Sequence, residues 1–336
     1  MKFGLFGGAR SQGGGPAGDS LGYRAWLDYV QAAEALGFHS VFVVEHHFTG
    51  RGQVSASLDL LSYLAGTTHR IRLGTAVVVL PWHNPALLAE QVATVDLLSG
   101  GRVDFGIGKG YRASEFHGFA IPPEEAQARF DECRDFLRRA WLEEGRFSHH
   151  GRFWRFDDVV IEPRPVQQPH PPFWMAAGSP DSIRRAAADE YNLLLDQIAP
   201  IGHIHERVAI YRAEQSRLGL PAKPEQIAVA RALQIVHSAG ERRQAEEIRL
   251  QVLRNIGDLA RGEGAERYRS LGADADPALA KEDAPLLGTP DEIISRLECL
   301  AAGGVDYVLL VDPTGSIRAL ETFAARIMPR FADPRA

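Results

Sequence analysis

Three adjacent residues, Glu45, His46 and His47, place a carboxylate and two imidazoles at the end of the apolar run SVFVV (40–44). Histidine accepts or donates a proton near neutral pH. Neighbouring side chains on a strand point to opposite sides, so His46 and His47 should have different roles. Zinc would require three or four ligands, and the only other plain cluster, HIHE (203–206), lies in a predicted surface helix. The motif therefore predicts proton transfer and no metal site.

These residues must be positioned by the strand that precedes them, and similar apolar runs alternate with segments of helical periodicity along the chain. The alternation predicts an α/β protein, and eight repeats predict a closed (β/α)8 TIM barrel in a single domain, 1–336. An open doubly wound sheet is the alternative, although no GxGxxG motif follows the first strand. Chemistry in such barrels occurs at the carboxyl ends of the strands, where the Glu-His-His motif falls. The predicted strands are 2–6, 40–44, 71–80, 103–108, 173–178, 192–196, 227–238 and 305–311.

Two segments interrupt the alternation. Residues 146–172 have the pattern of a hairpin followed by a proline-rich crossing, which predicts an insertion after the fourth strand and not a second domain. Residues 257–287, after the seventh strand, have weak periodicity and many small or charged side chains. That composition fits a mobile lid as well as a long surface loop.

The bulk properties exclude several classes of protein. The chain has 336 residues and a net charge of −6, with 45% apolar and 24% charged residues, which is typical of a globular protein and gives no reason to expect nucleic-acid binding. No stretch approaches the roughly 18 apolar residues that cross a membrane, and the start, MKFGLFGG, does not suggest a signal peptide. We expect Cys133 and Cys299 to be buried, unpaired thiols in a reduced, cytoplasmic setting.

Seven motifs in order along almost the whole chain resemble the bacterial-luciferase-like family of flavin-dependent monooxygenases, near the luciferase α-subunit. The resemblance implies a TIM barrel that takes reduced FMN from a separate NAD(P)H:flavin reductase. With O2 it would form a flavin hydroperoxide and oxygenate a small organic substrate. It also implies a homodimer, with helices near 57–69 and 85–99 in the interface. The motifs are MKFG (1–4), GFHSVFVVEHHF (37–48), RLGTAVVVLP (72–81), LLSGGRVDFGIGKGY (97–111), PFWMAAGSPDS (172–182), LGTPDEII (287–294) and IMPRF (327–331).

The resemblance also implies roles for individual residues. His46 would face the flavin and handle protons, and Phe6 and Trp82 would line an apolar substrate site. Lys109 and the start of the helix after the fifth strand would hold the FMN phosphate, because free N–H groups and the helix dipole favour anions. The plain alternative is that Ser179 only caps that helix and that Lys109 is solvated. The implied cofactor residues are Gly74, Ala76, Val77, Gly108, Lys109, Ala177, Gly178, Ser179 and Ser182.

The third strand and the fourth carry two further expectations. The family has a backbone kink that matches Ala76 and Val77, and we predict a cis peptide between them. Small residues at Gly74 and Ala76 would let a planar ring approach the backbone. Gly108 stands where the luciferase α-subunit has a cysteine, which opens space near the ring and favours a substrate chemistry other than light emission.

Two other functions are compatible with the same barrel. One branch of the superfamily binds a deazaflavin and transfers hydride without oxygen. Luciferase β-subunits and flavin-storing relatives keep the barrel as non-catalytic partners or flavin-binding proteins. The EHHF motif (45–48) and Lys109 favour the monooxygenase.

Overall fold

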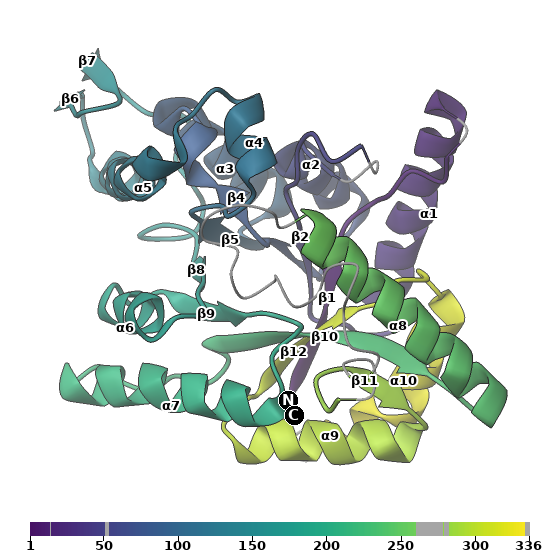
Figure 1. Cartoon of the computed structure of the whole chain (residues 1–336). Helices are drawn as coiled ribbons and strands as arrows, with labels where there is room; N and C mark the ends of the chain where they lie inside the picture. The colour runs from purple at the N-terminus through teal and green to yellow at the C-terminus, as the bar shows by residue number, and fades with distance from the viewer. Residues whose placement is uncertain (14, 51–53, 260–277, 279–281, 333–336) are drawn as a thin grey trace.

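Eight parallel strands form a closed barrel in the computed structural model, which describes residues 1–13, 15–50, 54–259, 278 and 282–332 (Figure 1). The sheet closes because β9 pairs with β10 and β1 pairs with both β2 and β12. The predicted (β/α)8 TIM barrel is therefore confirmed. The barrel strands are β1 (Lys2–Gly7), β2 (Ser40–Val43), β3 (Arg72–Thr75) with its continuation β4 (Val78–Val79), β5 (Val103–Gly108), β8 (Phe173–Ala176), β9 (Asn192–Leu195), β10 (Ile227–Ile235) and β12 (Tyr307–Val311).

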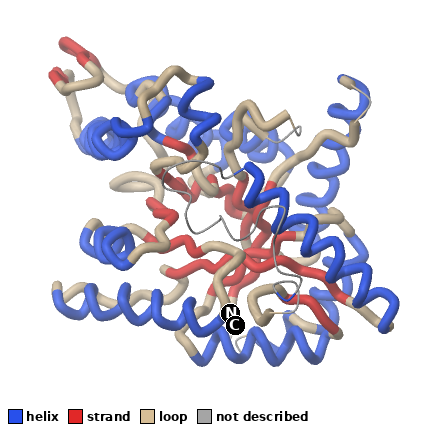
Figure 2. The backbone as a smooth tube through the Cα atoms, viewed as in Figure 1, coloured by secondary structure: helices blue, strands red, loops and turns tan. Residues whose placement is uncertain are grey.

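Helices surround the strands (Figure 2). Local sequence signals set their ends: Asn84 caps α3 by accepting hydrogen bonds from the N–H groups of Ala86 and Leu87, and Gly100 ends it in the left-handed conformation. A capping box between Thr289 and Glu292 begins α9. The helices are α1 (Pro16–Ala35), α2 (Ser57–Thr67), α3 (Pro85–Ser99), α4 (Ala113–Gly118), α5 (Ala126–Leu142), α6 (Pro180–Ala188), α7 (Ile201–Arg217), α8 (Ala239–Leu259), α9 (Pro290–Ala302) and α10 (Ile317–Arg326), with short 3-10 turns η1 (Leu80–Trp82), η2 (Pro123–Glu125) and η5 (Met328–Phe331).

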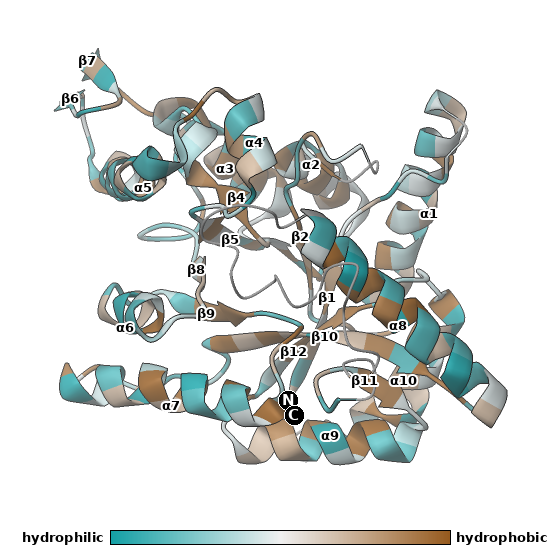
Figure 3. Cartoon of the chain, viewed as in Figure 1, coloured by the Kyte–Doolittle hydropathy of each residue, from teal (hydrophilic) through white to brown (hydrophobic). Residues whose placement is uncertain are grey.

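The main core lies between the strands and the buried faces of the helices, and hydrophobic colour follows the strands in Figure 3. A second cluster fills the barrel interior, where the rings of Phe42, Trp174 and Tyr307 meet edge to face. Burial of one such ring stabilises the fold by about 1.5–3 kcal/mol. Gly74 leaves room for Phe42, because a Cβ at Gly74 would overlap the Phe42 ring. The cluster therefore closes the barrel interior with packed rings, as in other TIM barrels.

The predicted insertion is confirmed as an antiparallel hairpin of β6 (Phe147–His150) and β7 (Arg155–Val159). Glu132 on α5 holds its turn, because its carboxylate accepts hydrogen bonds from the N–H groups of Arg152, Phe153 and Trp154. The hairpin projects away from the barrel beyond α5 (Figure 1). Its side chains Phe147, Phe156 and Val159 belong to the main core or pack against it.

The lid-like segment 257–287 falls mostly on residues 260–277 and 279–281, which lie outside the described residues. Its described ends belong to regular elements. Helix α8 runs to Leu259, and β11 (Leu286–Gly288) pairs with β10, a short strand that the sequence did not predict. Cys133 is buried as expected, but the expectation for Cys299 was wrong, since that thiol is exposed. Within the described residues, no helix is long and apolar enough to cross a membrane.

Candidate active site

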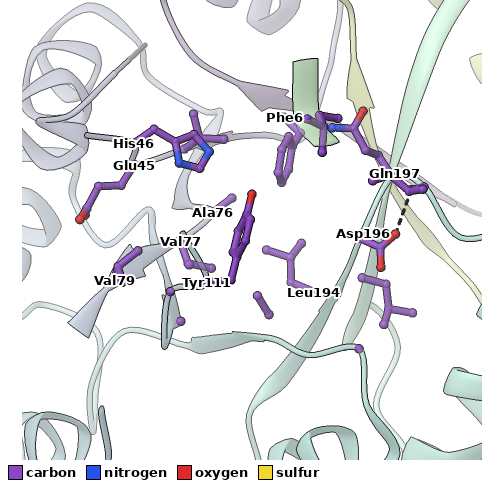
Figure 4. Close-up of a pocket in the computed structure, with 18 of the residues that line it drawn as sticks. Phe6, Glu45, His46, Ala76, Val77, Val79, Tyr111, Leu194, Asp196 and Gln197 are labelled. Carbon is purple, nitrogen blue, oxygen red and sulfur yellow. Dashed lines mark hydrogen bonds between the residues drawn. The ribbon is translucent and has the colours of Figure 1, made fainter. Parts of the chain in front are cut away.

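A cavity of about 1010 Å³ opens at the carboxyl ends of the barrel strands. This size and position are typical of the ligand site of a TIM-barrel enzyme. Residues from several strands far apart in the sequence line it, among them Phe6 on β1 and Leu194 on β9 (Figure 4). Of the catalytic and cofactor residues predicted from the sequence, Gly74 alone is not among the lining residues. Those that line the cavity are His46, Ala76, Val77, Gly108, Lys109, Ala177, Gly178, Ser179 and Ser182.

The imidazole of His46 points into this cavity, whereas the carboxylate of Glu45 points away from it (Figure 4). Nδ1 of His46 lies 3.2 Å from Oε1 of Glu115, a buried carboxylate that also accepts the backbone N–H of His47 at 3.0 Å. An ionised carboxylate can only accept, so the hydrogen bond assigns the ring proton to Nδ1. Nε2 is then left with a free electron pair that can accept a proton inside the cavity.

Burial lowers the pKa of His46 below its usual 6.5, although the hydrogen bond that His46 donates to Glu115 acts in the opposite direction. The ring is therefore neutral at pH 7. A neutral imidazole with a fixed tautomer is suited to act as a base through Nε2. Glu115 was missed by the sequence reasoning, because it lies on the short helix α4, which was not predicted either.

Glu45 belongs to the cavity lining, but its carboxylate turns away from the cavity and joins His47 in a structural cluster (Figure 4). The buried carboxylate of Glu45 accepts hydrogen bonds from Nε1 of Trp82 at 2.8 Å and from Nε2 of His83 at 3.0 Å, and it lies 3.2 Å from Nε2 of His47. Burial alone would raise the pKa of Glu45, but these hydrogen bonds outweigh it and lower the pKa to about 2. The expected division of roles between His46 and His47 therefore agrees with the geometry.

The expectation that Trp82 lines the substrate site was wrong. Its ring stacks on Phe119 with centroids 5.1 Å apart, and its N–H is held by Glu45, so it lies outside the set of cavity-lining residues. Phe6 does line the cavity. Within the described residues, no group of three or more His, Cys, Asp or Glu side chains could hold a metal ion.

The backbone between β3 and β4 forms one wall of the cavity, and its Ala76–Val77 peptide bond is cis, as predicted. A Cβ at Gly108 would overlap a methyl group of Val77. The glycine therefore gives the Val77 side chain its place on the cavity wall. Gly74 has the different role already described, since its missing side chain makes room for Phe42 and not for a ligand.

One corner of the cavity combines a helix N-terminus with cationic side chains. Ser179 caps α6 by accepting the N–H of Ser182 at 3.3 Å, and the hydroxyl of Ser182 accepts the N–H of Ser179 at 3.2 Å. Both serines are exposed to the cavity, as is Lys109, and Arg185 lines the same corner. Ser179 thus caps α6, as the alternative in the sequence analysis predicted. The same position at a helix N-terminus also suits an anion. Arg185 was not anticipated from the sequence.

The described geometry agrees with three comparisons with known proteins. The oxygenase component of a flavin-dependent trigonelline monooxygenase from Acinetobacter baylyi is 31% identical over 182 residues, 53% of this chain and 49% of that protein. An F420-dependent glucose-6-phosphate dehydrogenase from Intrasporangium calvum is 34% identical over 177 residues, 50% of this chain and 52% of that protein. The chain thus spans about half the length of several curated relatives that it matches.

A solved structure, the monooxygenase RslO1 from Streptomyces bottropensis, superposes with a TM-score of 0.85 at 28% identity, covering 99% of this chain and 100% of that one. The family model described as "Luciferase-like monooxygenase" matches residues 1–307, which include all barrel strands up to the start of β12. Relatives of this kind are oxidoreductases that depend on a flavin or on F420. This chain belongs to the luciferase-like monooxygenase family.

Proposed function

We propose that the protein is a flavin-dependent monooxygenase that binds reduced FMN, supplied by a separate NAD(P)H:flavin reductase, and uses O2 to oxygenate a small organic substrate. The observation that carries the proposal is the position of His46. Its neutral ring faces a cavity of about 1010 Å³ that Lys109, Arg185 and the start of α6 also line. A flavin mononucleotide has the two parts that such a cavity would accept, a planar ring and a phosphate.

The residues of the cavity fit FMN in two places. Lys109, Arg185 and the N-terminus of α6 would hold the phosphate through their charges and through the positive end of the helix dipole. The wall formed by Ala76 and Val77 would support the ring. The bound flavin supplies the oxygen chemistry. The chain supplies a buried site in which Nε2 of His46 accepts a proton from the reacting groups or returns it to them.

Binding of reduced FMN is the first expected result. Anaerobic titration should show binding of both reduced FMN and reduced riboflavin, with FMN bound more tightly because of its phosphate. Lys109→Met should weaken FMN binding about ten-fold and leave riboflavin binding unchanged, since a charge-assisted contact contributes about 1.5–3 kcal/mol. After mixing with O2, bound FMN should reoxidise more slowly than free reduced FMN. Equal effects of Lys109→Met on both flavins would rule out the phosphate assignment.

A deazaflavin-dependent hydride transfer is the second candidate, and the similarity to an F420-dependent dehydrogenase supports it. The same titration separates the two candidates. Tight binding of reduced F420 together with no binding of reduced FMN would favour hydride transfer. In that case Nε2 of His46 would still be placed to exchange a proton with the substrate.

We also propose that the protein is a homodimer that associates through α2 and α3. These helices pack side by side, and exposed apolar side chains lie on both of them. On α3, Leu87 and Leu98 are 53% and 59% exposed and lie on one helix face, and Tyr63 on α2 is 55% exposed. Apolar groups gathered on one surface mark an interface more often than scattered ones do.

The double substitution Leu87→Glu with Leu98→Glu should convert the dimer into a monomer, because two carboxylates would be buried without partners in the interface. Size-exclusion chromatography with light scattering measures the mass directly. Leu218→Glu, at the end of α7 and 40% exposed in the wild type, is the matched control and should remain dimeric. A monomeric wild-type protein, or a dimeric double variant, would exclude this interface.

A further inference from the structure

Arg249 on α8 is a buried cation on the wall of the cavity. The residue is only 2% exposed. Its Nη2 donates a hydrogen bond to the backbone oxygen of Gln197 at 3.2 Å, which fixes the guanidinium against the loop after β9. Its Nε and Nη1 have no hydrogen-bond partner within the part of the chain that the structure describes. Two nitrogens of a charged group, with three N–H groups, are thus buried beside the cavity without an acceptor among the described residues.

A comparison with Arg231, the other fully buried arginine nearby, shows that the incomplete hydrogen bonding of the Arg249 guanidinium is unusual. Arg231 does not line the cavity. Its two terminal nitrogens donate hydrogen bonds to the backbone oxygens of Asp196, Ala199 and Ala230. It therefore acts as a structural brace. Nε lacks a partner in both arginines, but only Arg249 also has a terminal nitrogen, Nη1, without one among the described residues. A buried charge with incomplete hydrogen bonds costs several kcal/mol.

The acidic groups near Arg249 do not pair with it. The carboxylate of Asp196 binds Arg207 at 2.9 Å and accepts two backbone N–H groups, and Glu282 acts on Arg249 only through its charge. Burial lowers the pKa of Arg249 to about 10, so the group remains charged at pH 7. The cavity wall therefore presents a positive charge whose own hydrogen bonds are incomplete.

The surroundings of Arg249 combine polar and apolar groups. The side-chain oxygens of Gln197 and Gln234 are also buried without partners, and both residues line the cavity. Val252 and Ile256, one and two turns further along α8, line it as well. In Figure 4, Gln197 lies on the opposite side of the cavity from His46. The composition suits a ligand that has an apolar body and one charged end.

We propose that Arg249 binds the acidic group, a carboxylate or sulfonate, of the organic substrate. The proposal rests on the proposed function, in which the flavin phosphate takes the corner formed by α6 and Lys109. Helices α6 and α8 lie on different sides of the barrel mouth (Figure 1), so the two anion sites are distinct. The free N–H donors of a charged guanidinium suit the oxygen atoms of a carboxylate or sulfonate. The apolar body of the substrate would then extend from Arg249 toward the flavin.

The test is calorimetric titration of the full chain with matched probes, both without flavin and in the presence of saturating FMN. The acids are benzoate, phenylacetate, hexanoate and benzenesulfonate, and the neutral counterparts are benzamide, phenylacetamide, hexanamide and benzenesulfonamide. At least one acid should bind ten-fold or more tightly than its neutral counterpart. Arg249→Met should remove this preference, and Arg249→Lys, which keeps the charge but loses the planar set of N–H donors, should reduce it.

Arg243→Met is the matched control, because Arg243 lies on the same helix and is exposed to solvent. It should keep the preference for the acid. The proposal is wrong if no acid binds better than its neutral counterpart, or if Arg249→Met keeps the preference. Competition between the acid and FMN, with weaker FMN binding in Arg249→Met, would assign the arginine to the flavin phosphate and also overturn it. Failure of FMN to bind would instead reject the flavin function, while the titration without flavin would still decide the role of Arg249.

Discussion

Replacing His46 with alanine should leave FMN binding almost unchanged and uncouple the reaction. The imidazole contributes a proton acceptor at Nε2 and no charge, because its pKa lies below its usual value and it is neutral at pH 7. Positioned proton transfer typically contributes about 10²–10⁴-fold to a rate. In the variant, reduced FMN should therefore reoxidise in the presence of substrate and O2 with release of hydrogen peroxide. Product formation should fall by about 10²-fold or more.

The measurement combines three readings on the same reaction: the return of oxidised FMN absorbance, the yield of hydrogen peroxide and the yield of oxygenated product. His47→Ala is the control, since His47 follows directly in the chain but binds Glu45 outside the cavity. It should lower stability without changing the ratio of product to peroxide. An unchanged ratio in His46→Ala would contradict the assigned role of His46. Equal uncoupling in both variants would show that the whole Glu-His-His segment matters only as structure.

The strands of the barrel could be predicted from the sequence because each is a local apolar signal. The run SVFVV (40–44) predicts a strand, and β2 occupies Ser40–Val43. The elements that were missed are too short to show a period: α4 has six residues and β11 has three. The pairing of β11 with β10 depends on the rest of the barrel and is not encoded in its own three residues.

The site residues likewise divide into those that could be predicted from the sequence and those that could not. His46 could be predicted because the resemblance implies that the first histidine of the EHHF motif (45–48) faces the flavin. Glu115, its hydrogen-bond partner, lies 69 positions away, and nothing in the local sequence distinguishes it from a surface glutamate. Arg249 likewise has the sequence context of an ordinary helix charge, and only tertiary packing buries it beside the cavity. Trp82 is a large aromatic residue of the kind that often lines a pocket. Its N–H, however, donates to the carboxylate of Glu45, which points away from the cavity.

Glu45 is the residue whose substitution should cost most stability. In Glu45→Gln the new amide N–H groups would meet Nε1 of Trp82 and Nε2 of His83, which are donors to the carboxylate in the wild type. The decrease in pKa from 4.5 to about 2 on folding corresponds to about 3 kcal/mol of stability above pH 4.5. We therefore expect the free energy of unfolding at pH 7 to fall by about 3 kcal/mol, measured by urea denaturation.

The pH dependence tests the cause of this loss. Because folding lowers the pKa of Glu45, its contribution is complete above pH 4.5 and is lost as the pH falls toward 2. The difference in unfolding free energy between wild type and Glu45→Gln should therefore narrow by about 2 kcal/mol from pH 5 to pH 3. Glu298→Gln, on an exposed ion pair with Arg330, is the control and should change stability by less than about 0.5 kcal/mol at either pH. The difference in unfolding free energy between wild type and Glu45→Gln could instead stay constant with pH. The substitution would then destabilise the fold through poorer packing, and not through loss of the ionised carboxylate and its three donors.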